Sequence, residues 1–217
     1  ASWSVGNHDA IRVMTRWGGE NAPSSFASLI LAMQLSLKGT PCLYQGDELA
    51  LPEADVPFEL LQDPYGITFW PEFKGRDGCR TPMPWTNAAP NAGFTEGKPW
   101  LPVAVPHLAA SVSQQELDPA SSLNAARRII HWRQSLPQLT RGDISFFDAP
   151  EPVLALRRTL DGEATVLAAF NLSNAPVTID WPETAGAQVL AGHGLPGEAA
   201  NGRVTLPAYG AWFGTSA

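Results

Sequence analysis

The chain has 217 residues, 44% of them hydrophobic and 16% charged, which is typical of a globular protein and excludes a disordered one. Its net charge of -7, with no basic stripe, excludes the phosphate contacts that a nucleic-acid partner needs, so a neutral substrate is favoured. No run is long and apolar enough for a membrane span, and the first residues do not form a signal peptide. Cys42 and Cys79 are too few for a disulfide framework. We therefore expect a cytoplasmic protein without a membrane partner.

Polar side chains gather directly after the first short apolar run. Residues 4–9 (SVGNHD) end in an amide, an imidazole and a carboxylate, as polar groups at the end of a buried barrel strand do. Arg12 and Arg16 follow four residues apart on one predicted helix face and are interpreted as structural. Apolar spacing then predicts a helix over residues 26–37, and residues 40–45 predict a short buried strand. A helix between two short strands indicates a parallel βαβ unit.

The middle of the chain, residues 46–119, is rich in Pro, Gly, Asp and Trp, with only a brief helical candidate at 55–61. So long an irregular tract is usually either functional or disordered, and its many aromatic residues favour an ordered, functional loop. Within it, residues 75–85 (GRDGCRTPMPW) form a polar and aromatic segment that is too rigid for a linker.

The last part of the chain changes from helix to strands. A helix is predicted over residues 122–135, and Pro137 ends it. Beyond residue 142, short apolar runs without helices between them predict an antiparallel β-sandwich, with a tight hairpin at Asp161-Gly162. The predicted strands are residues 153–158, 165–171, 177–181, 188–190, 203–206 and 209–213. We place a domain boundary near residue 140, which gives domains 1–140 and 141–217.

Three segments in order, residues 4–9, 39–48 and 76–85, strongly resemble the α-glucosidase and oligo-1,6-glucosidase branch of the family 13 glycoside hydrolases, the α-amylase superfamily. The resemblance implies that residues 1–140 are the C-terminal part of a (β/α)8 TIM barrel, about strands 7 and 8 with helices 7 and 8. Residues 141–217 would be the small β-sandwich domain. The first six strands and an inserted subdomain would precede residue 1, so we expect a C-terminal fragment. Because a slice of barrel exposes unpaired strand edges, its expected partner is the missing N-terminal part of the same protein or another copy of the chain.

The resemblance also implies an activity: a retaining α-glucosidase that hydrolyses α-glucosidic bonds of short oligosaccharides or sucrose-like sugars. Retaining hydrolysis needs a nucleophilic carboxylate and a carboxylic acid about 5 to 5.5 Å apart, and nothing in this chain resembles the motif of either. We therefore expect the chain alone to be inactive. No cofactor or metal is expected, since His8, His107, His131 and His193 are scattered without ligand spacing.

Four residues are the candidates for contacts with the sugar. Asp9 matches the family's third acidic residue, which holds hydroxyls of the cleaved sugar and stabilises the transition state by position. His8 matches the neighbouring imidazole, and Arg76 an arginine of the final loop that reaches back over the pocket. Glu53 is a candidate contact to sugar units beyond the scissile bond. The alternatives are a helix cap or an ion pair with Arg12 for Asp9, a satisfied loop residue for His8 and a solvated acid for Glu53.

Other charged and aromatic residues are interpreted as structural. Arg80, Asp77 and Trp85 are expected to hold the long loop rigid. Asp47 and Glu48 are adjacent on a segment predicted to be extended, so their side chains would point to opposite faces and could not flank one bond. We interpret them as loop anchors.

Three other functions remain open. A sugar isomerase or transglycosylase would use the same site and differ in how water and acceptor sugars are handled. A non-catalytic structural partner built on the same barrel would be expected to have a damaged third carboxylate, whereas residues 7–9 are intact. A carbohydrate-binding module in residues 141–217 is a weaker alternative.

Overall fold

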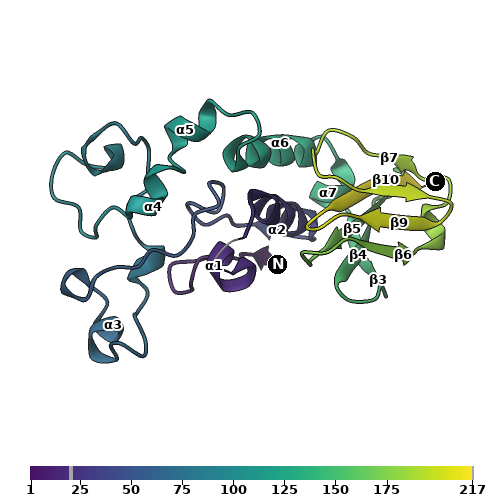
Figure 1. The fold of residues 1–217 in the computed structure, drawn as a ribbon. Helices are drawn as coiled ribbons and strands as arrows, with labels where there is room; N and C mark the ends of the chain where they lie inside the picture. The colour runs from purple at the N-terminus through teal and green to yellow at the C-terminus, as the bar shows by residue number, and fades with distance from the viewer. Residues whose placement is uncertain (20–21, 217) are drawn as a thin grey trace. The chain divides into compact units, whose positions relative to one another are not determined.

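The computed structural model describes residues 1–19 and 22–216, and Figure 1 labels its elements. The chain divides into two compact units, each assembled from segments that are not consecutive in the sequence. The domain boundary predicted near residue 140 stays a prediction. The first unit comprises Ala1–Trp3, Ser28–Cys42 and Ala125–Ala217, and the second comprises Ser4–Ala27 and Leu43–Asn124.

A parallel βαβ arrangement opens the chain. β1 (Ser2–Trp3) pairs in parallel with β2 (Thr40–Pro41), and α2 (Ser24–Ser36) runs between them in sequence, so the predicted helix and the parallel pairing are confirmed. Buried Gln34 of α2 ties the two strands together, because its amide donates to Trp3 O at 2.7 Å and to Cys42 O at 2.9 Å.

The strand predicted over residues 40–45 is wrong in length and in burial. β2 holds only Thr40 and Pro41, and neither residue is fully buried. Its partner among the described residues is the two-residue β1, and so short a pair does not hold a longer strand. The backbone turns instead at Tyr44, whose carbonyl accepts a hydrogen bond from Asp47 N at 3.0 Å.

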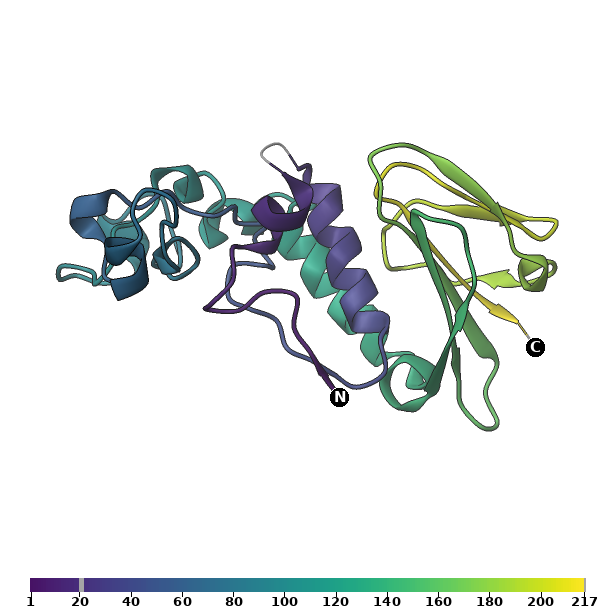
Figure 2. The same ribbon diagram turned by 90° about the horizontal axis from the view of Figure 1, so that it is seen from below.

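The helix predicted over residues 122–135 is confirmed as α6 (Ser122–Gln134). Within the first unit α6 lies beside α2 (Figure 2), where Arg133 Nε donates to Leu35 O at 2.7 Å. Pro137 does more than end this helix, because it starts α7 (Pro137–Arg141), and proline is favourable at the first helical position.

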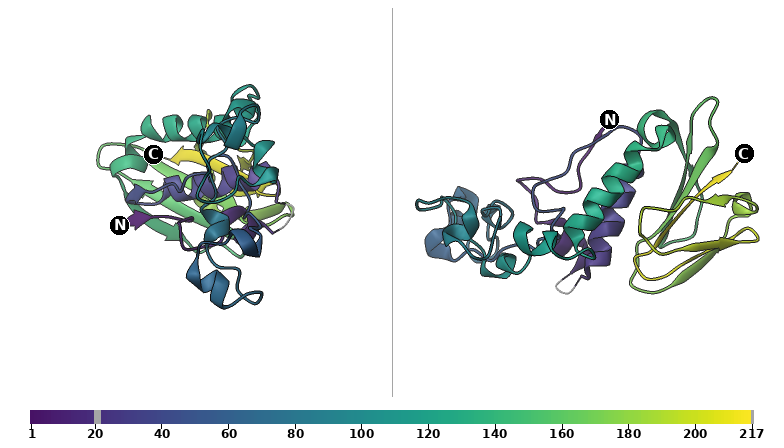
Figure 3. Two further views of the ribbon diagram at one scale, coloured as in Figure 1. Left: turned by 90° about the vertical axis from the view of Figure 1, so that its left-hand side faces the viewer. Right: turned by 90° about the horizontal axis from the view of Figure 1, so that it is seen from above.

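Two sheets complete the first unit (Figure 3), and every strand pair in them is antiparallel, as predicted. One sheet has the order β3-β4-β5-β10-β7 and the other β6-β9-β8. Side chains from both sheets pack into one core that contains Trp181 and Trp212. The bounds are β3 (Asp143–Phe147), β4 (Val153–Thr159), β5 (Thr165–Asn171), β6 (Val177–Asp180), β7 (Gln188–Val189), β8 (Glu198–Ala200), β9 (Arg203–Leu206) and β10 (Ala211–Ser216).

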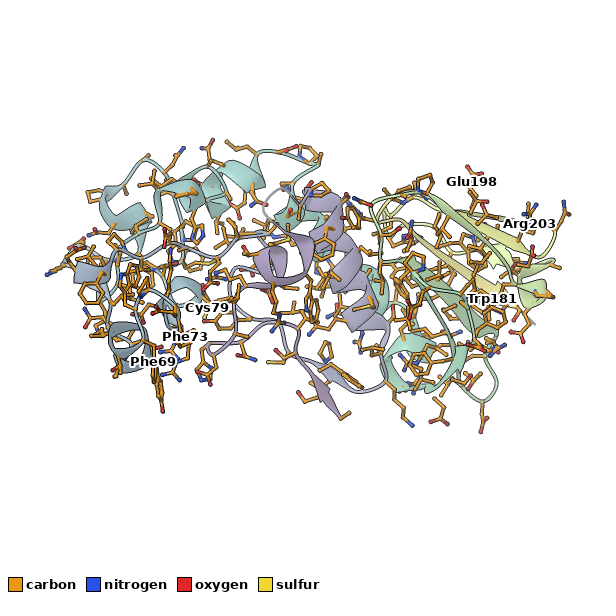
Figure 4. The ribbon with its side chains drawn as sticks, turned by 60° about the horizontal axis from the view of Figure 1, so that its bottom comes forward. Phe69, Phe73, Cys79, Trp181, Glu198 and Arg203 are labelled. Carbon is orange, nitrogen blue, oxygen red and sulfur yellow. The ribbon has the colours of Figure 1, made fainter. Side chains whose placement is uncertain are left out.

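The sequence pattern misses β3 and β8 because neither strand carries a buried apolar face. β3 is held instead by tertiary contacts. Its Phe147 stacks on Trp181, with the ring centroids 5.0 Å apart, and Trp181 is labelled in Figure 4. β10 starts at Ala211 rather than at 209, because Tyr209 has a φ of 52° and a strand does not accommodate left-handed backbone.

The second unit contains the long tract of residues 46–119, which is ordered by short helices. Small apolar clusters hold its turns together, one of them formed by Val56, Leu61 and Leu101. Among the described residues, no helix is both long and apolar enough to cross a bilayer. The helical segments are α1 (Val13–Gly18), η1 (Phe58–Leu60), α3 (Pro64–Thr68), η2 (Asp77–Cys79), η3 (Pro90–Gly93), α4 (Val105–Leu108) and α5 (Val112–Glu116).

Candidate functional site

The turn at Asn7-His8-Asp9, in the second unit, presents its polar side chains to solvent. Asn7 Oδ1 accepts a hydrogen bond from Asp9 N at 2.8 Å, which fixes the turn. His8 Nε2 lies 3.4 Å from Asp9 Oδ2, and the two side chains are 71% and 53% exposed. The preceding Gly6 is required here, because a Cβ at that position would lie 2.7 Å from Asp47 Oδ2.

Two arginines from the long loop bind one oxygen of this turn. Arg76 Nη1 lies 3.1 Å and Arg80 Nη2 lies 2.9 Å from Asp9 Oδ1. Arg80 Nε also donates to His8 O at 2.7 Å. These charge-assisted hydrogen bonds fix the orientation of the Asp9 carboxylate and leave Oδ2 facing His8. The structure therefore brings Asp9, His8 and Arg76 together, with Arg80 added, whereas Arg80 was expected only to hold its own loop.

A buried carboxylate positions Arg76. Asp63 is 1% exposed, and its two carboxylate oxygens accept hydrogen bonds from Arg76 Nε and Nη2, both at 2.8 Å. These hydrogen bonds hold the pKa of Asp63 well below its usual range. Asp63 also caps α3 by accepting from Tyr65 N at 3.2 Å, and the Tyr65 ring lies 5.2 Å from the Arg76 guanidinium carbon.

Asp63 is a site residue that the sequence pattern does not single out, although its local role is encoded. The pair Asp63-Pro64 is a cap followed by proline at the first helical position, which predicts the start of α3. Nothing in that local pattern indicates that the same carboxylate also binds an arginine 13 residues away.

Asp77 holds the loop rigid, as predicted. Its side chain is fully buried, and Oδ2 accepts hydrogen bonds from Gln62 N at 2.6 Å and Asp63 N at 2.8 Å.

Cys79, at the end of the same turn, is also fully buried, whereas Phe69 and Phe73 lie on the outer side of the unit (Figure 4). Burial raises the pKa of the Cys79 thiol to about 11, so it is not a reactive nucleophile.

Glu53 does not join the Asp9 group. Its Oε2 accepts a hydrogen bond from Arg12 N at 2.7 Å, and its Oε1 lies against Gly78, where an added Cβ would clash with it. Burial raises the pKa of this carboxyl. The alternative of a solvated surface acid is therefore wrong, and a contact from Glu53 to distant sugar units stays a prediction.

Arg12 is structural, as predicted, and is not the ion-pair partner of Asp9. It is 1% exposed, and its guanidinium donates to Gln45 O at 2.8 Å and to Cys79 O at 3.0 Å. Asp9 does not cap α1, the helix that follows it, since α1 begins after Arg12 without a side-chain cap. Both alternative roles considered for Asp9 are therefore wrong.

The segment around Asp47 and Glu48 is not extended, contrary to our expectation. Residues 45–50 form consecutive turns, and Glu48 Oε2 accepts from Gly46 N at 2.8 Å, which makes Glu48 a turn anchor. Asp47 Oδ2 is buried, with no hydrogen-bond partner in the part of the chain that the structure describes. Burial raises the pKa of Asp47 to about 6.

No His, Cys, Asp and Glu side chains form a group of three or more that could hold a metal ion within residues 1–19 and 22–216. The chemistry of the Asp9 group is instead that of hydrogen bonding to a polar ligand. One carboxylate oxygen is held by two guanidiniums, and the other lies beside an exposed imidazole.

Comparison with known proteins identifies the family. The sequence model of the alpha-amylase catalytic domain matches residues 1–142. The chain belongs to the alpha-amylase family. It is 44% identical over 214 residues to a probable alpha-glucosidase of Rhizobium meliloti (strain 1021), a match that covers 98% of this chain and 38% of that protein. A probable oligo-1,6-glucosidase of Bacillus subtilis (strain 168) is 32% identical over 200 residues, covering 83% of this chain and 35% of that protein.

Solved structures of other family members share the fold. The alpha-glucosyl transfer enzyme XgtA superposes with a TM-score of 0.94 at 49% identity, covering 100% of this chain and 40% of that one. The trehalulose synthase MutB, in a complex of its E254Q mutant with sucrose, superposes with a TM-score of 0.84 at 25% identity over 99% of this chain. This alpha-amylase family chain therefore spans about two fifths of the length of the proteins it matches. Its helices and antiparallel sheets are consistent with part of a TIM barrel followed by a sheet domain.

Proposed function

We propose that this chain is part of a retaining α-glucosidase that hydrolyses α-glucosidic bonds of short oligosaccharides or sucrose-like sugars. The observation that carries the proposal is the Asp9 carboxylate, exposed to solvent yet fixed by Arg76 and Arg80, in a member of the alpha-amylase family. The name of the relative from R. meliloti supports the same substrate class.

In this proposal residues 1–140 supply about strands 7 and 8 and helices 7 and 8 of a (β/α)8 barrel, and residues 141–217 a C-terminal sandwich domain. The parallel pairing of β1 with β2 and the close superposition on XgtA support that assignment. The nucleophile and the general acid belong to the rest of the protein. We also propose a cytoplasmic location, since Cys42 and Cys79 are both free thiols.

Asp9 acts by position and not by proton transfer. Because the two arginines hold Oδ1, the carboxylate is already oriented before a sugar arrives and needs no reorganisation in the transition state. Oδ2 and His8 are both exposed, so they can accept from and donate to hydroxyls of the cleaved sugar. The negative charge of Asp9 then stabilises the positive charge that develops on the sugar ring.

The test is Asp9→Asn in the full-length protein, assayed on an aryl α-glucoside. We expect kcat to fall about 10²- to 10³-fold, the usual effect of removing one preorganised electrostatic group. Asp180→Asn is the matched control, because Asp180 is also an exposed carboxylate paired with an arginine, Arg203, at 3.1 Å. Near-normal turnover in Asp9→Asn, with the control also active, would contradict the role given to Asp9.

A second test uses the 217-residue chain by itself. We expect no turnover of the aryl α-glucoside, because the proposal places the two reacting carboxylates elsewhere in the protein. Measurable turnover that Asp9→Asn abolishes would show that the chain carries a complete site.

The alternative is glucosyl transfer or isomerisation at the same site, which the names of XgtA and MutB favour. Product analysis on maltose and on sucrose separates the activities. Free glucose as the main product supports hydrolysis, whereas glucosylated acceptors or rearranged disaccharides support the alternative. A non-catalytic structural partner is disfavoured, because the Asp9 group is complete.

A further inference from the structure

A cavity lies in the second unit, apart from the Asp9 group. Its volume is about 370 Å³, and it is lined by Glu59, Leu60, Gln62, Asn91, Lys98, Pro99, Trp100, Pro102 and Val103. None of the residues that contact Asp9 lines it. We call it the Trp100 cavity, after the indole in its wall. Its volume is at the lower end of the range for small-molecule sites, which suits one or two sugar rings.

Buried neighbours fix the walls of the Trp100 cavity. Leu61 and Leu101 are 6% and 1% exposed and pack together with Val56. The residues on either side of each buried leucine, among them Gln62 and Trp100, line the cavity. Because both wall segments are anchored in one apolar cluster, the backbone of each wall is held in place before any ligand arrives.

Trp100 is 64% exposed, although it lies between two anchored segments. Pro99 directly before it and Pro102 shortly after it, both in the cavity wall, restrict the backbone there. In this chain, an exposed indole face in a proline-restricted segment is a candidate binding surface.

Polar side chains surround this indole without partners of their own. Across the described residues, the side chains of Glu59, Gln62 and Lys98 form no hydrogen bond, whereas Asn91 Nδ2 is fixed by donating to two backbone carbonyls, one of them Gly97 O at 2.8 Å. The negative charge of Glu59 and the positive charge of Lys98 cancel. An aromatic face, amide groups and a net charge near zero match a neutral ring that has an apolar face and a rim of hydroxyls.

We infer that the Trp100 cavity is a second sugar site, which binds a glucosyl unit of an α-linked oligosaccharide without taking part in bond cleavage. The inference takes its substrate class from the proposed function but does not depend on the role of Asp9. The wall also continues into the Asp9 group along the backbone. Gln62 N donates to Asp77, and the next residue, Asp63, holds Arg76. The cavity wall therefore includes Gln62, the residue directly before the Asp63 that positions Arg76.

The test is fluorine NMR of the full-length protein labelled with fluorotryptophan, in the Asp9→Asn background to limit turnover. Trp100→Phe identifies the Trp100 resonance by its loss. We expect maltotriose or isomaltotriose to shift this resonance saturably, with a dissociation constant on the order of 1 mM for so open a site. The resonance of Trp17, which is 53% exposed but outside the cavity, is the internal control and should not move.

A side-chain variant separates direct binding from a distant effect of the Asp9 group. Gln62→Ala removes one hydrogen-bonding wall residue and should weaken the saturable shift roughly 2- to 10-fold, the effect of one hydrogen bond. The inference is overturned if the Trp100 resonance does not shift, if Gln62→Ala leaves the titration unchanged, or if sorbitol shifts the resonance equally.

A separate activity assay distinguishes this inference from the proposed function. Wild-type protein is assayed on an aryl α-glucoside, which has a single glucosyl unit. Turnover without a Trp100 shift rejects the second site alone, whereas a Trp100 shift without turnover rejects the hydrolase activity alone.

Discussion

Asp63 and Arg76 form a two-point ion pair, in which Nε donates to Oδ2 and Nη2 to Oδ1, each at 2.8 Å. The remaining guanidinium nitrogen, Nη1, lies 3.1 Å from Asp9 Oδ1. Arg76 therefore links a buried carboxylate to an exposed one, and Asp63 decides where the guanidinium meets Asp9. The planar fork of arginine suits this arrangement, because three of its nitrogens point in fixed directions.

Replacing Asp63 should impair the site through Arg76. In Asp63→Asn one oxygen acceptor remains, the two-point pair is lost, and the Arg76 guanidinium is no longer fixed. We expect kcat/KM on an aryl α-glucoside to fall up to about 10²-fold, the effect of a small displacement in an active site. Kinetics of the full-length protein, normalised to the folded fraction by circular dichroism, give the value. Asp55→Asn is the control, because Asp55 also pairs with a loop cation, Lys74, at 2.7 Å. Equal effects of the two variants would contradict the positioning role.

Arg80 should not tolerate lysine. Arg80 uses Nε for His8 O and Nη2 for Asp9 Oδ1, and a single ammonium group cannot reproduce both directions. We expect kcat to fall about 10-fold in Arg80→Lys and about 10²-fold in Arg80→Ala, because charge without geometry recovers part of the effect. Steady-state kinetics of both variants test this order. Wild-type turnover in Arg80→Lys would show that only the charge matters.

Asp47 should make the folded state less stable as the pH rises from about 4 to 6. Burial raises the pKa of this carboxyl from 3.8 to about 6, so the folded state binds a proton more tightly than the unfolded chain in this window. Deprotonation above pH 6 then costs the folded state up to about 3 kcal/mol, at about 1.4 kcal/mol per pH unit. Below pH 4 both states are protonated, and this cost disappears.

Asp47→Asn removes the titration but keeps the shape of the side chain. We expect the variant to be more stable than the wild type at pH 7 and equally stable near pH 4. Urea unfolding of both proteins from pH 4 to pH 7 gives the difference in their free energies of unfolding. Contributions from other titrating groups such as Glu53 are common to both proteins and cancel in this difference. A difference that does not change with pH would show that Asp47 has an ordinary pKa.

Arg158, in the first unit, should be essential for stability. Its side chain is 1% exposed, and its guanidinium donates to Ser36 O at 2.7 Å, Leu139 O at 3.0 Å and Gly142 O at 2.8 Å. Burial lowers its pKa to about 10, so it stays charged at neutral pH. Arg158→Met leaves these carbonyls without their donor.

We expect Arg158→Met to destabilise the protein by about 3 kcal/mol or more, because hydrogen bonds to a buried charged group are lost together. Chemical denaturation measures the change in the free energy of unfolding. Arg203→Met is the control, since its exposed pair with Asp180 should contribute less than about 1 kcal/mol. Similar losses in the two variants would contradict the role of Arg158.

The elements that depend on local pattern are readable from the amino-acid sequence. Apolar spacing located α2 and α6, apolar runs located most strands of the two sheets, and three short segments indicated the family. These features are encoded within about a dozen neighbouring residues, and so they are readable without a structure.

The assembly of the site depends on contacts between residues far apart in the sequence. Asp9 meets Arg76 and Arg80 across 67 and 71 residues of sequence, and the direction of an arginine side chain after a long loop is not encoded locally. The same reason applies to Glu53, whose carboxylate turns to Arg12 N across 41 residues. Residue types and order are local properties of the chain, whereas pairing between distant charges depends on loop closure and burial, which exist only in the folded protein.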